Sequence, residues 1–388
     1  MLNSVVGQVA RGDKYFERPY VTKIVWSVIL NGNNILISAP RRVGKSSLMC
    51  HLLENPILGY RVIYLTTESV DDDNEFFKRI FTELVSKLNG FQKYAKQFTT
   101  LLKKFGLSVE AIGKDGIKIK DGEVDYFEEL KKLLREIDLE GDRIIILIDE
   151  YAQTVENIKE KYNPSIARKF LEKNRELRQD SRIFNKVNFI YAGSISLQAI
   201  VDNIESSHTT NDLYSFDFKP FSLSETQELI SMIMRDSGYR ISKKMTKYLI
   251  ERVEWLIPFH IQIILDEAQK FCLENKSNEF TQIVIEEAIK SALNIKSYFQ
   301  HWDTRLKKVL KGNEYKFANE LLNSLSNSIR LEKKDIVDIA EKYEVMESYR
   351  KIIDILEYDG YINNKNENGL YNFNSPILKL WWNKNVAN

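Results

Sequence analysis

The chain of 388 residues has only two cysteines, Cys50 and Cys272, and its four histidines are scattered. So few sulfur and imidazole groups, so far apart, predict neither a disulfide framework nor a thiolate metal cluster. The longest purely aliphatic run, Ile144–Ile148, is far too short to cross a membrane. The N-terminal sequence also lacks the apolar core of a secretion signal. These absences predict a cytoplasmic protein without a membrane partner.

The sequence also lacks an excess of charge of one sign. Lys and Arg number 56 and Asp and Glu number 55, which gives a formal net charge of +1. A balanced chain has no global attraction to nucleic acid or to an anionic membrane, so any nucleic-acid surface has to be local. At this length, two or three domains are expected.

Short apolar runs alternate with helical patterns up to about residue 220. This alternation, with unbroken β-branched runs, predicts a parallel, doubly wound α/β sheet. The sequence around 107–122 has Lys-Asp-Gly between two short alternating runs, which predicts an inserted β-hairpin. The predicted strands of the main sheet are Ile35–Ser38, Arg61–Thr66, Ile144–Asp149 and Val187–Ala192.

The pattern changes after residue 220. Residues 221–300 contain mainly amphipathic helices, and 301–388 contain three helical stretches followed by a short β-hairpin. Helices followed by such a hairpin have the outline of a winged helix. The sequence therefore predicts three domains, with boundaries at 1–220, 221–300 and 301–388.

A phosphate-binding motif lies between the first predicted strand and a helix. The pattern G-x-x-x-x-G-K-[ST] is matched at its second glycine, its lysine and its hydroxyl residue, whereas alanine replaces the first glycine. Backbone amides and the helix N-terminus surround phosphates in such a loop. A chance Gly-Lys-Ser in an ordinary turn is the alternative. The residues expected to bind nucleotide are Ala39, Pro40, Arg41, Arg42, Val43, Gly44, Lys45, Ser46 and Ser47.

Two carboxylates follow the aliphatic strand at 143–148. In open α/β sheets, ligands bind at the carboxyl ends of the strands. Asp149 is expected to hold Mg²⁺ together with the Ser46 hydroxyl, and Lys45 is expected to reach the β- and γ-phosphates. Glu150 is expected to orient and deprotonate the attacking water. The alternative is a solvated acidic strand end without a catalytic role.

The fourth predicted strand ends in Gly193-Ser194. Ser194 is a candidate sensor of the γ-phosphate, and a helix N-cap formed by Ser194 or Ser196 is the alternative. Three arginines precede this strand, at 175, 178 and 182. One of them could act as an arginine finger, but a solvated basic helix face is the favoured interpretation.

These pieces occur in the order of a known family. The motifs are YFER at 15–18, APRRVGKSSL at 39–48, IDE at 148–150, AGSI at 192–195, LEYDGY at 356–361 and FNSPIL at 373–378, followed by Trp381. The chain resembles the archaeal-type P-loop ATPases of the AAA+/STAND lineage, which are related to origin-recognition ATPases. The resemblance covers nearly the whole chain, and the Pro-Arg-Arg-x-Gly-Lys loop is its most specific part.

The resemblance implies an ATPase core, a helical lid and a C-terminal winged helix. It places Phe16 and Arg18 on a segment near the adenine. In the lid it aligns Pro258 with a Gly-x-Pro motif that approaches the base, although the glycine is replaced here. The arginine usual at the sensor position of the lid is also missing. His260 or Gln262 could substitute for it, although a packed histidine is the favoured interpretation of His260.

The function expected from the sequence is an ATP-hydrolysing switch that uses ATP and Mg²⁺ and controls the binding of a DNA or protein partner. The alternatives are a DNA-binding regulator with incidental turnover and a scaffold that holds ATP without hydrolysis. From Arg330 to Asn388 there are nine Lys or Arg and ten Asp or Glu, so this block has no excess of cations. The sequence leaves the oligomeric state open.

Overall fold

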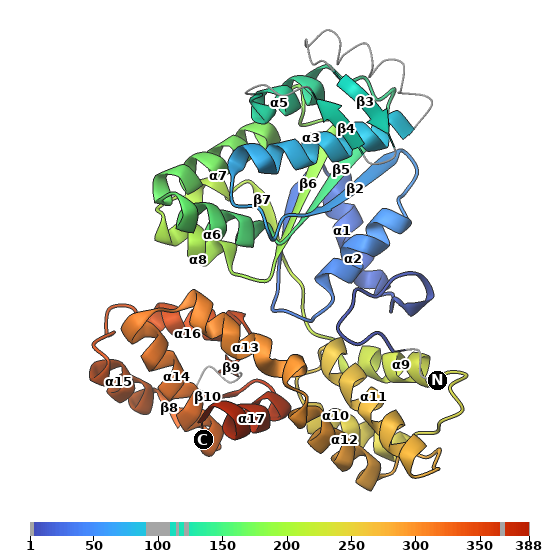
Figure 1. Ribbon diagram of the computed structural model, residues 1–388, viewed down its shortest axis with the longest axis vertical. Coiled ribbons are helices and arrows are strands. Elements are labelled where there is room, and N and C mark those ends of the chain that lie inside the picture. Colours follow the sequence, from blue (N-terminus) through green and yellow to red (C-terminus); the bar gives the residue numbers. More distant parts are fainter. Residues whose placement is uncertain (1–3, 91–108, 114–115, 120–123, 365–368, 388) are drawn as a thin grey trace. The chain divides into compact units, whose positions relative to one another are not determined.

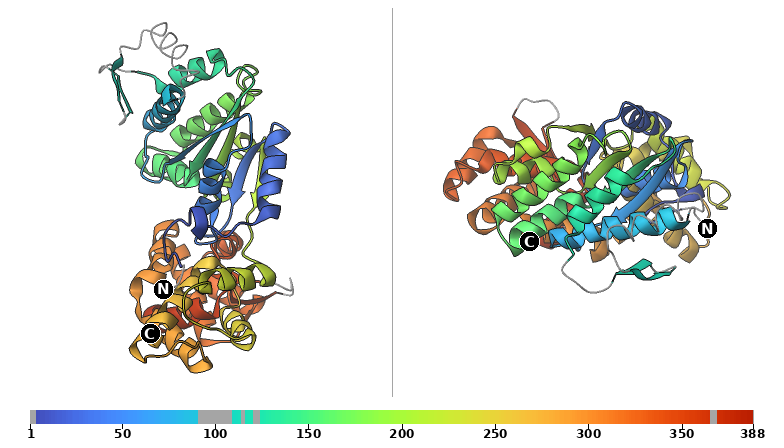
Figure 2. Two further views of the ribbon diagram at one scale, coloured as in Figure 1. Left: turned by 90° about the vertical axis from the view of Figure 1, so that its right-hand side faces the viewer. Right: turned by 90° about the horizontal axis from the view of Figure 1, so that it is seen from above.

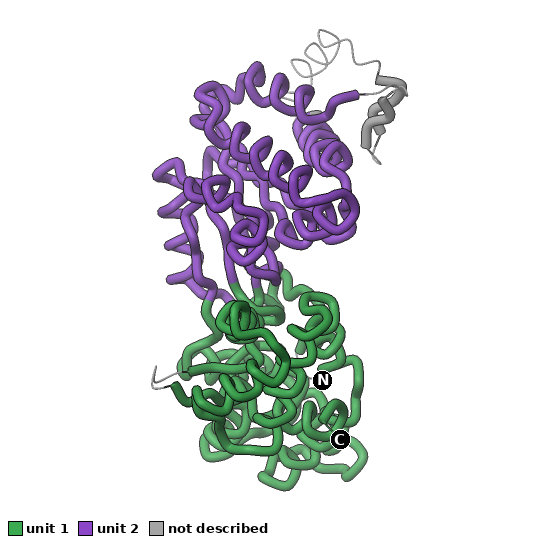
Figure 3. Tube along the Cα trace, turned by 90° about the vertical axis from the view of Figure 1, so that its left-hand side faces the viewer, with its two compact units in different colours: residues 1–16, 39–44, 219–388 green, residues 17–38, 45–218 purple. Residues whose placement is uncertain are grey.

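The structure is a computed structural model, and it describes residues 4–90, 109–113, 116–119, 124–364 and 369–387. The chain divides into two compact units (Figure 3). The first, here called unit 1, contains residues 1–16, 39–44 and 219–388. The second, unit 2, contains residues 17–38 and 45–218.

Unit 2 is built around a parallel sheet of five strands in the order β2-β5-β6-β1-β7 (Figure 1). The α/β fold predicted from the sequence is confirmed, and the four predicted strands lie within a residue of their expected bounds. The fifth strand, β7, was not predicted. The strands are β1 (Asn34–Ser38), β2 (Tyr60–Thr66), β5 (Arg143–Asp149), β6 (Val187–Gly193) and β7 (Leu213–Asp217).

Helices cover both faces of this sheet, which explains why the three interior strands, β5, β6 and β1, are buried almost throughout. Figures 1 and 2 show α1 and α2 on one face and α3, α6, α7 and α8 on the other. The helices of unit 2 are α1 (Pro19–Leu30), α2 (Lys45–Glu54), α3 (Asp73–Gly90), α5 (Tyr126–Glu136), α6 (Tyr151–Lys161), α7 (Pro164–Gln179) and α8 (Leu197–Asn203).

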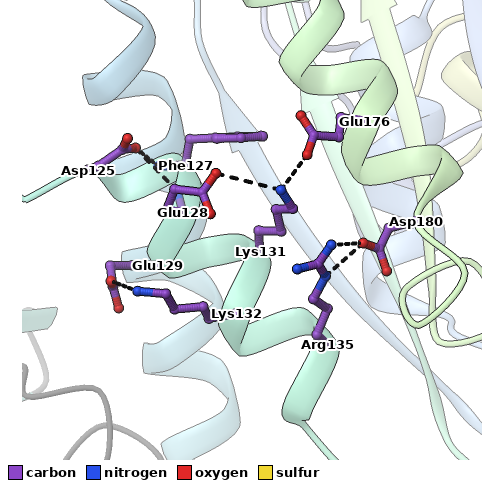
Figure 4. Close-up of polar contacts among 9 residues, drawn as sticks. All are labelled: Asp125, Phe127, Glu128, Glu129, Lys131, Lys132, Arg135, Glu176 and Asp180. Carbon is purple, nitrogen blue, oxygen red and sulfur yellow. Dashed lines mark hydrogen bonds and ion pairs between the residues drawn. The ribbon is translucent and has the colours of Figure 1, made fainter.

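Helix α5 illustrates how the local sequence sets an element and docks it (Figure 4). Asp125 is its N-cap and accepts hydrogen bonds from the amides of the first turn. Lys131 pairs with Glu176 of α7, and Arg135 pairs with Asp180, the residue that ends α7. The apolar side of α5 thus faces the core while its cations fix it to α7.

The inserted hairpin is confirmed in the part that the structure describes. Strands β3 (Val109–Gly113) and β4 (Gly116–Ile119) pair antiparallel. The remaining residues of the predicted 107–122 segment lie outside the described residues.

Unit 1 begins its helical region after residue 219. The helices expected at 224–234, 243–253 and 261–273 are confirmed, and two further helices precede the C-terminal block. The helices of this region are α9 (Leu223–Met234), α10 (Lys243–Val253), α11 (Pro258–Glu274), α12 (Gln282–Asn294) and α13 (Lys296–Val309).

In the residues that the structure describes, the C-terminal block contains four α-helices and a three-stranded antiparallel sheet in the order β8-β10-β9. The three helices and the hairpin expected from the sequence are present, and a last helix, α17, follows them. The elements are α14 (Gly312–Asn327), β8 (Leu331–Glu332), α15 (Lys333–Lys342), α16 (Tyr349–Tyr358), β9 (Ile362–Asn363), β10 (Leu370–Phe373) and α17 (Pro376–Trp382).

Within unit 1, the helical region and the C-terminal block share a core. Gly360 has a φ of +81°, and a Cβ atom at this position would lie 2.4 Å from Trp255. Arg305 of α13 forms a buried, bidentate ion pair with Asp359. Residues 219–388 therefore belong to one compact unit, while the boundary at residue 300 stays a prediction.

Candidate functional site

The carboxyl ends of three adjacent strands form the candidate site in unit 2. β6 lies between β1 and β5, and all three run parallel. In this register Ser38 is opposite Gly193, and Ile148 is opposite Tyr191. The polar residues that follow these strands therefore emerge at the same edge of the sheet, where ligands bind in open α/β folds.

Asp149 is the centre of this edge. The Ser46 hydroxyl donates a hydrogen bond of 2.6 Å to Asp149 Oδ2, and the Tyr64 hydroxyl donates one of 3.1 Å to the same oxygen. The Glu150 amide donates to Asp149 Oδ1 at 3.0 Å. Burial raises the pKa of Asp149, and the charge of Glu150 adds to this, while Ser46, Tyr64 and Lys45 act against it.

Glu150 is held by the end of the neighbouring strand. Its Oε2 accepts hydrogen bonds from the Ser194 hydroxyl at 2.9 Å and from the Ser194 amide at 3.2 Å. Glu150 itself has a φ of +58°, an uncommon value for a residue other than glycine. A Cβ at Gly193 would lie 3.0 Å from the Cβ of Ala152, so β6 closely approaches α6 here.

This donor set fits a magnesium ion and a phosphate chain. The Ser46 hydroxyl and the Asp149 carboxylate, already in contact, are hard oxygen ligands of the type that Mg²⁺ prefers, and Mg²⁺ in such sites takes its other ligands from water and phosphates. Lys45 is the buried first residue of α2, so its charge adds to the partial positive charge of the helix N-terminus. Ser47 follows in the same turn.

The rest of the phosphate-loop motif, residues 39–44, belongs to unit 1. Gly44 has a φ of +107°, which requires glycine, whereas Ala39 has a negative φ, so its methyl group causes no backbone strain. Val43 is fully buried. Arg42 has a φ of +68° and donates from Nη1 to the Gly7 carbonyl at 3.0 Å.

The residues expected near the adenine fall in both units. Phe16 packs against Phe221 in unit 1, with ring centroids 5.3 Å apart. Pro258 is the first residue of α11. Arg18 belongs to unit 2, where it is buried and its guanidinium lies 5.1 Å from the Phe218 ring. Their role toward a base stays a prediction.

The structure separates the interpretations left open for the lid residues. His260 is fully buried among aromatic rings that include Trp255 and Trp302, which confirms that it is a packed histidine. Burial lowers its pKa to about 3. Burial also lowers the pKa of His301 to about 3, with further repulsion from Arg42 and other cations. Gln262 accepts a hydrogen bond from the Val5 amide.

Of the two serines expected as a possible helix N-cap, Ser194 or Ser196, the structure confirms Ser196. Ser196 is the N-cap of α8, where its side chain accepts from the Ala199 amide at 3.1 Å, whereas Ser194 holds Glu150.

The favoured interpretation of the three arginines was wrong for Arg178. This side chain is buried and forms a bidentate ion pair with Asp212, and it also donates to the Thr209 carbonyl. It is committed to the core rather than to solvent. Arg182 is exposed, as expected of a solvated face.

Two hydrogen bonds near the carboxyl ends of β2 and β5 were not predicted from the sequence. Tyr64 of β2 bonds to Asp149, and the Thr154 hydroxyl of α6 donates to the carbonyl of buried Thr67 at 2.7 Å. Tyr64 is a polar residue within an apolar strand run. A polar residue in such a run could have been identified as a candidate site residue. Its partner Asp149, however, could be known only from the order of the strands.

Two solved structures are similar to this chain along nearly its whole length. The Walker-type ATPase PABY2304 of Pyrococcus abyssi matches with a TM-score of 0.63 and 17% identity, covering 98% of this chain and 99% of that one. The ORC2 protein of Aeropyrum pernix, in ADPNP and ADP complexes, matches with a TM-score of 0.55 and 12% identity, covering 92% and 88%. No protein-family model and no curated protein matches the chain. At these identities the likeness establishes the fold alone, which this chain shares with both proteins.

None of the helices in the described part of the chain has both the length and the apolar character that a membrane span requires.

Proposed function

We propose that this protein binds ATP with Mg²⁺ at the edge formed by the ends of β1, β5 and β6, and that it hydrolyses the nucleotide. The observation that carries the proposal is the 2.6 Å contact between Ser46 of the phosphate-loop motif and Asp149, 103 residues further along the chain. Neither alternative, a chance Gly-Lys-Ser in an ordinary turn or a solvated acidic strand end, accounts for a hydrogen bond between these two residues. The fold shared with the Walker-type ATPase PABY2304, and with the ORC2 protein solved in ADPNP and ADP complexes, supports the same conclusion.

In the proposed mechanism, each residue has a separate task. Lys45 and the first amides of α2 bind the phosphates, and Ser46 and Asp149 hold the metal. Bound Mg²⁺ supplies positive charge that offsets the charge of the phosphate oxygens. The Glu150 carboxylate orients the attacking water and takes its proton. Ser194, bonded to Glu150, keeps that carboxylate in place.

The remaining loop residues, Ala39 to Gly44 and Ser47, would complete the phosphate cradle through their backbone. We place Phe16, Arg18 and Pro258 near the adenine by family resemblance. The tight engagement of Asp149 and Glu150 by hydroxyl donors supports a site prepared for turnover over a scaffold that only holds ATP.

The output is proposed to be a nucleotide-controlled change in partner binding, of the kind carried out by STAND-type switches, with the C-terminal block as a winged helix that contacts the partner. The charges of this block favour a protein partner. Helix α15 carries three lysines and three acidic residues, and α16 carries two basic and two acidic residues. DNA affinity depends on clustered cations, which these two helices lack.

The test is steady-state ATP turnover by the wild type and by Lys45→Ala and Glu150→Gln. Both variants are expected to lose turnover, by about 100-fold or more for Glu150→Gln, and only Lys45→Ala is expected to lose nucleotide affinity as well. Arg240→Ala, an exposed residue of unit 1, is the control. Retained turnover in Glu150→Gln would contradict the assigned role of that carboxylate.

The partner class is tested by adding duplex DNA to the same assays at low and high salt. No effect of DNA on turnover, and no salt-dependent binding, are the results expected for a protein partner. Binding that weakens steeply with salt and disappears when Lys333, Lys334, Arg350 and Lys351 are neutralised would instead favour the DNA-binding regulator.

A further inference from the structure

Arg42, in the middle of the phosphate-loop motif, is fixed by contacts within unit 1. Its guanidinium carbon lies 4.8 Å from the centroid of the Phe259 ring, and its Nη1 donates to the Gly7 carbonyl at 3.0 Å. Its φ of +68° is uncommon for a side chain of this size. Such a backbone persists only where the surrounding structure determines it. The side chain that this backbone directs is held by Phe259 and Gly7.

Phe259, which contacts Arg42, also packs against α13. Its ring meets Tyr298 and His301 of α13 edge-on, with centroid distances of 6.2 and 6.3 Å. Tyr298 in turn donates from its hydroxyl to Glu267 of α11 at 3.2 Å. The start of α11 and the first half of α13 therefore form one packed layer next to Arg42.

From Trp302 onward, α13 is bonded to the C-terminal block. Arg305 donates to both carboxylate oxygens of Asp359, at 2.6 and 2.7 Å, and both side chains are buried. The Tyr361 hydroxyl donates to the Trp302 carbonyl at 2.7 Å. Asp359 ends α16 and Tyr361 precedes β9, so one helix connects the Arg42 contact with the elements proposed to bind the partner.

We propose that Arg42 is a positioning residue that couples nucleotide binding in the phosphate loop to the C-terminal block by way of Phe259 and α13. The inference rests on the proposed nucleotide site. Amides of this loop would turn toward bound phosphates, so a change in the backbone at Arg42 displaces its guanidinium from Gly7 and Phe259. Packed side chains and buried ion pairs respond to such a displacement as a unit.

The tryptophans provide a direct readout of this coupling. Four of the five, Trp255, Trp302, Trp381 and Trp382, lie in unit 1, and Trp26 lies in unit 2. In the full-length protein carrying Trp26→Phe, tryptophan emission comes from unit 1. There Trp302 lies on α13, Trp255 contacts Trp302, and Trp381 stacks on Phe299 of α13. Nucleotide affinity is measured separately, from the anisotropy of a fluorescently labelled ADP in the presence of Mg²⁺.

The expected result is that unlabelled ADP with Mg²⁺ changes the emission of the reference protein, and that Arg42→Ala and Phe259→Leu lose most of this change while still binding labelled ADP. Arg42→Lys keeps a cation over the ring and should retain a part of the change. Arg240→Ala, an exposed arginine of the same unit, should behave like the reference. The affinity of Arg42→Ala should differ from that of the reference by about fivefold or more, because coupling is reciprocal.

The possible failures can be told apart. If the reference protein does not bind labelled ADP, the proposed function fails and the coupling fails with it. If it binds labelled ADP without a change in emission, or if Arg42→Ala keeps the full change, the coupling is overturned and the proposed function stands. A double-mutant cycle adds a check that a merely structural role would not pass. Arg42→Ala and Phe259→Leu should be non-additive in nucleotide affinity, and additive effects would overturn the assigned route.

Discussion

Ser194 donates two hydrogen bonds to one carboxylate oxygen of Glu150, one from its hydroxyl and one from its amide. The two residues directly follow neighbouring parallel strands, β6 and β5, so the bond links two parts of the sheet edge directly. Because the amide cannot be removed by substitution, the hydroxyl is the part of this interaction that mutation can test.

Replacing Ser194 by Ala should lower kcat by about 10-fold with little change in KM, because a less well-oriented Glu150 is a poorer base while phosphate binding is untouched. Ser194→Thr should retain most of the activity. Ser196→Ala is the matched control, since it removes the N-cap of α8 and should cost about 1 kcal/mol of stability without affecting kcat. A raised KM with unchanged kcat in Ser194→Ala would argue against this assignment.

Arg178 should behave as a structural residue. Arg178→Met leaves Asp212 without its partner in a largely buried place, and the expected loss in the free energy of unfolding is about 3 kcal/mol. Turnover per folded molecule, measured below the melting temperature of the variant, should persist. Arg182→Met, an exposed neighbour, should change stability by less than about 0.5 kcal/mol. Loss of turnover in a fully folded Arg178 variant would reopen the arginine-finger hypothesis.

The sequence predicted the central strands of the sheet because each is a continuous apolar run between helical patterns. β7 lacked that signal. It is an edge strand that pairs only with β1 in the described sheet, and its residues are mostly half-buried or exposed. Its pairing with β1, from Asn34 opposite Leu213 onward, is a long-range contact that no local pattern indicates.

The candidate site was predictable where a motif has fixed spacing, as for Lys45, Ser46 and Asp149. It was not predictable where the partner depends on strand order. Tyr64 reaches Asp149 because β2 and β5 are neighbours, and Arg178 finds Asp212 through the segment that leads into β7. In both cases the residue type was visible in the sequence, and its partner became known only with the fold.

Gly360→Ala should be strongly destabilising. The new Cβ would lie 2.4 Å from the Trp255 ring, and the residue would keep a φ of +81°. Overpacking and backbone strain together predict a loss of about 3 kcal/mol. At Gly312 the φ is +53° but nothing lies within 4 Å, so Gly312→Ala should cost only about 1 kcal/mol. Equal losses for the two variants, measured by chemical denaturation, would show that Trp255 yields without cost.

Acidification should weaken unit 1 through its buried histidines. The pKa of His260 is lowered to about 3 in the folded protein, below the value of about 6.5 in an unfolded chain. The unfolded state therefore binds more protons between these values, so the stability contributed by neutral His260 is complete above pH 6.5 and is lost as the pH falls toward 3. Between pH 7 and pH 5 this single group should remove about 2 kcal/mol from the free energy of unfolding.

The check is the pH dependence of unfolding in the wild type and in His260→Phe, followed by tryptophan emission. His301, whose pKa burial also lowers to about 3, is present in both proteins, so its own titration is common to both stability curves. Relative to the wild type, His260→Phe should gain about 2 kcal/mol on going from pH 7 to pH 5, whatever its stability at pH 7. Stability curves that run parallel across this range would mean that His260 is protonated in the folded protein, or that it leaves its aromatic surroundings before unfolding. The assignment of His260 as a buried, neutral side chain would then be wrong.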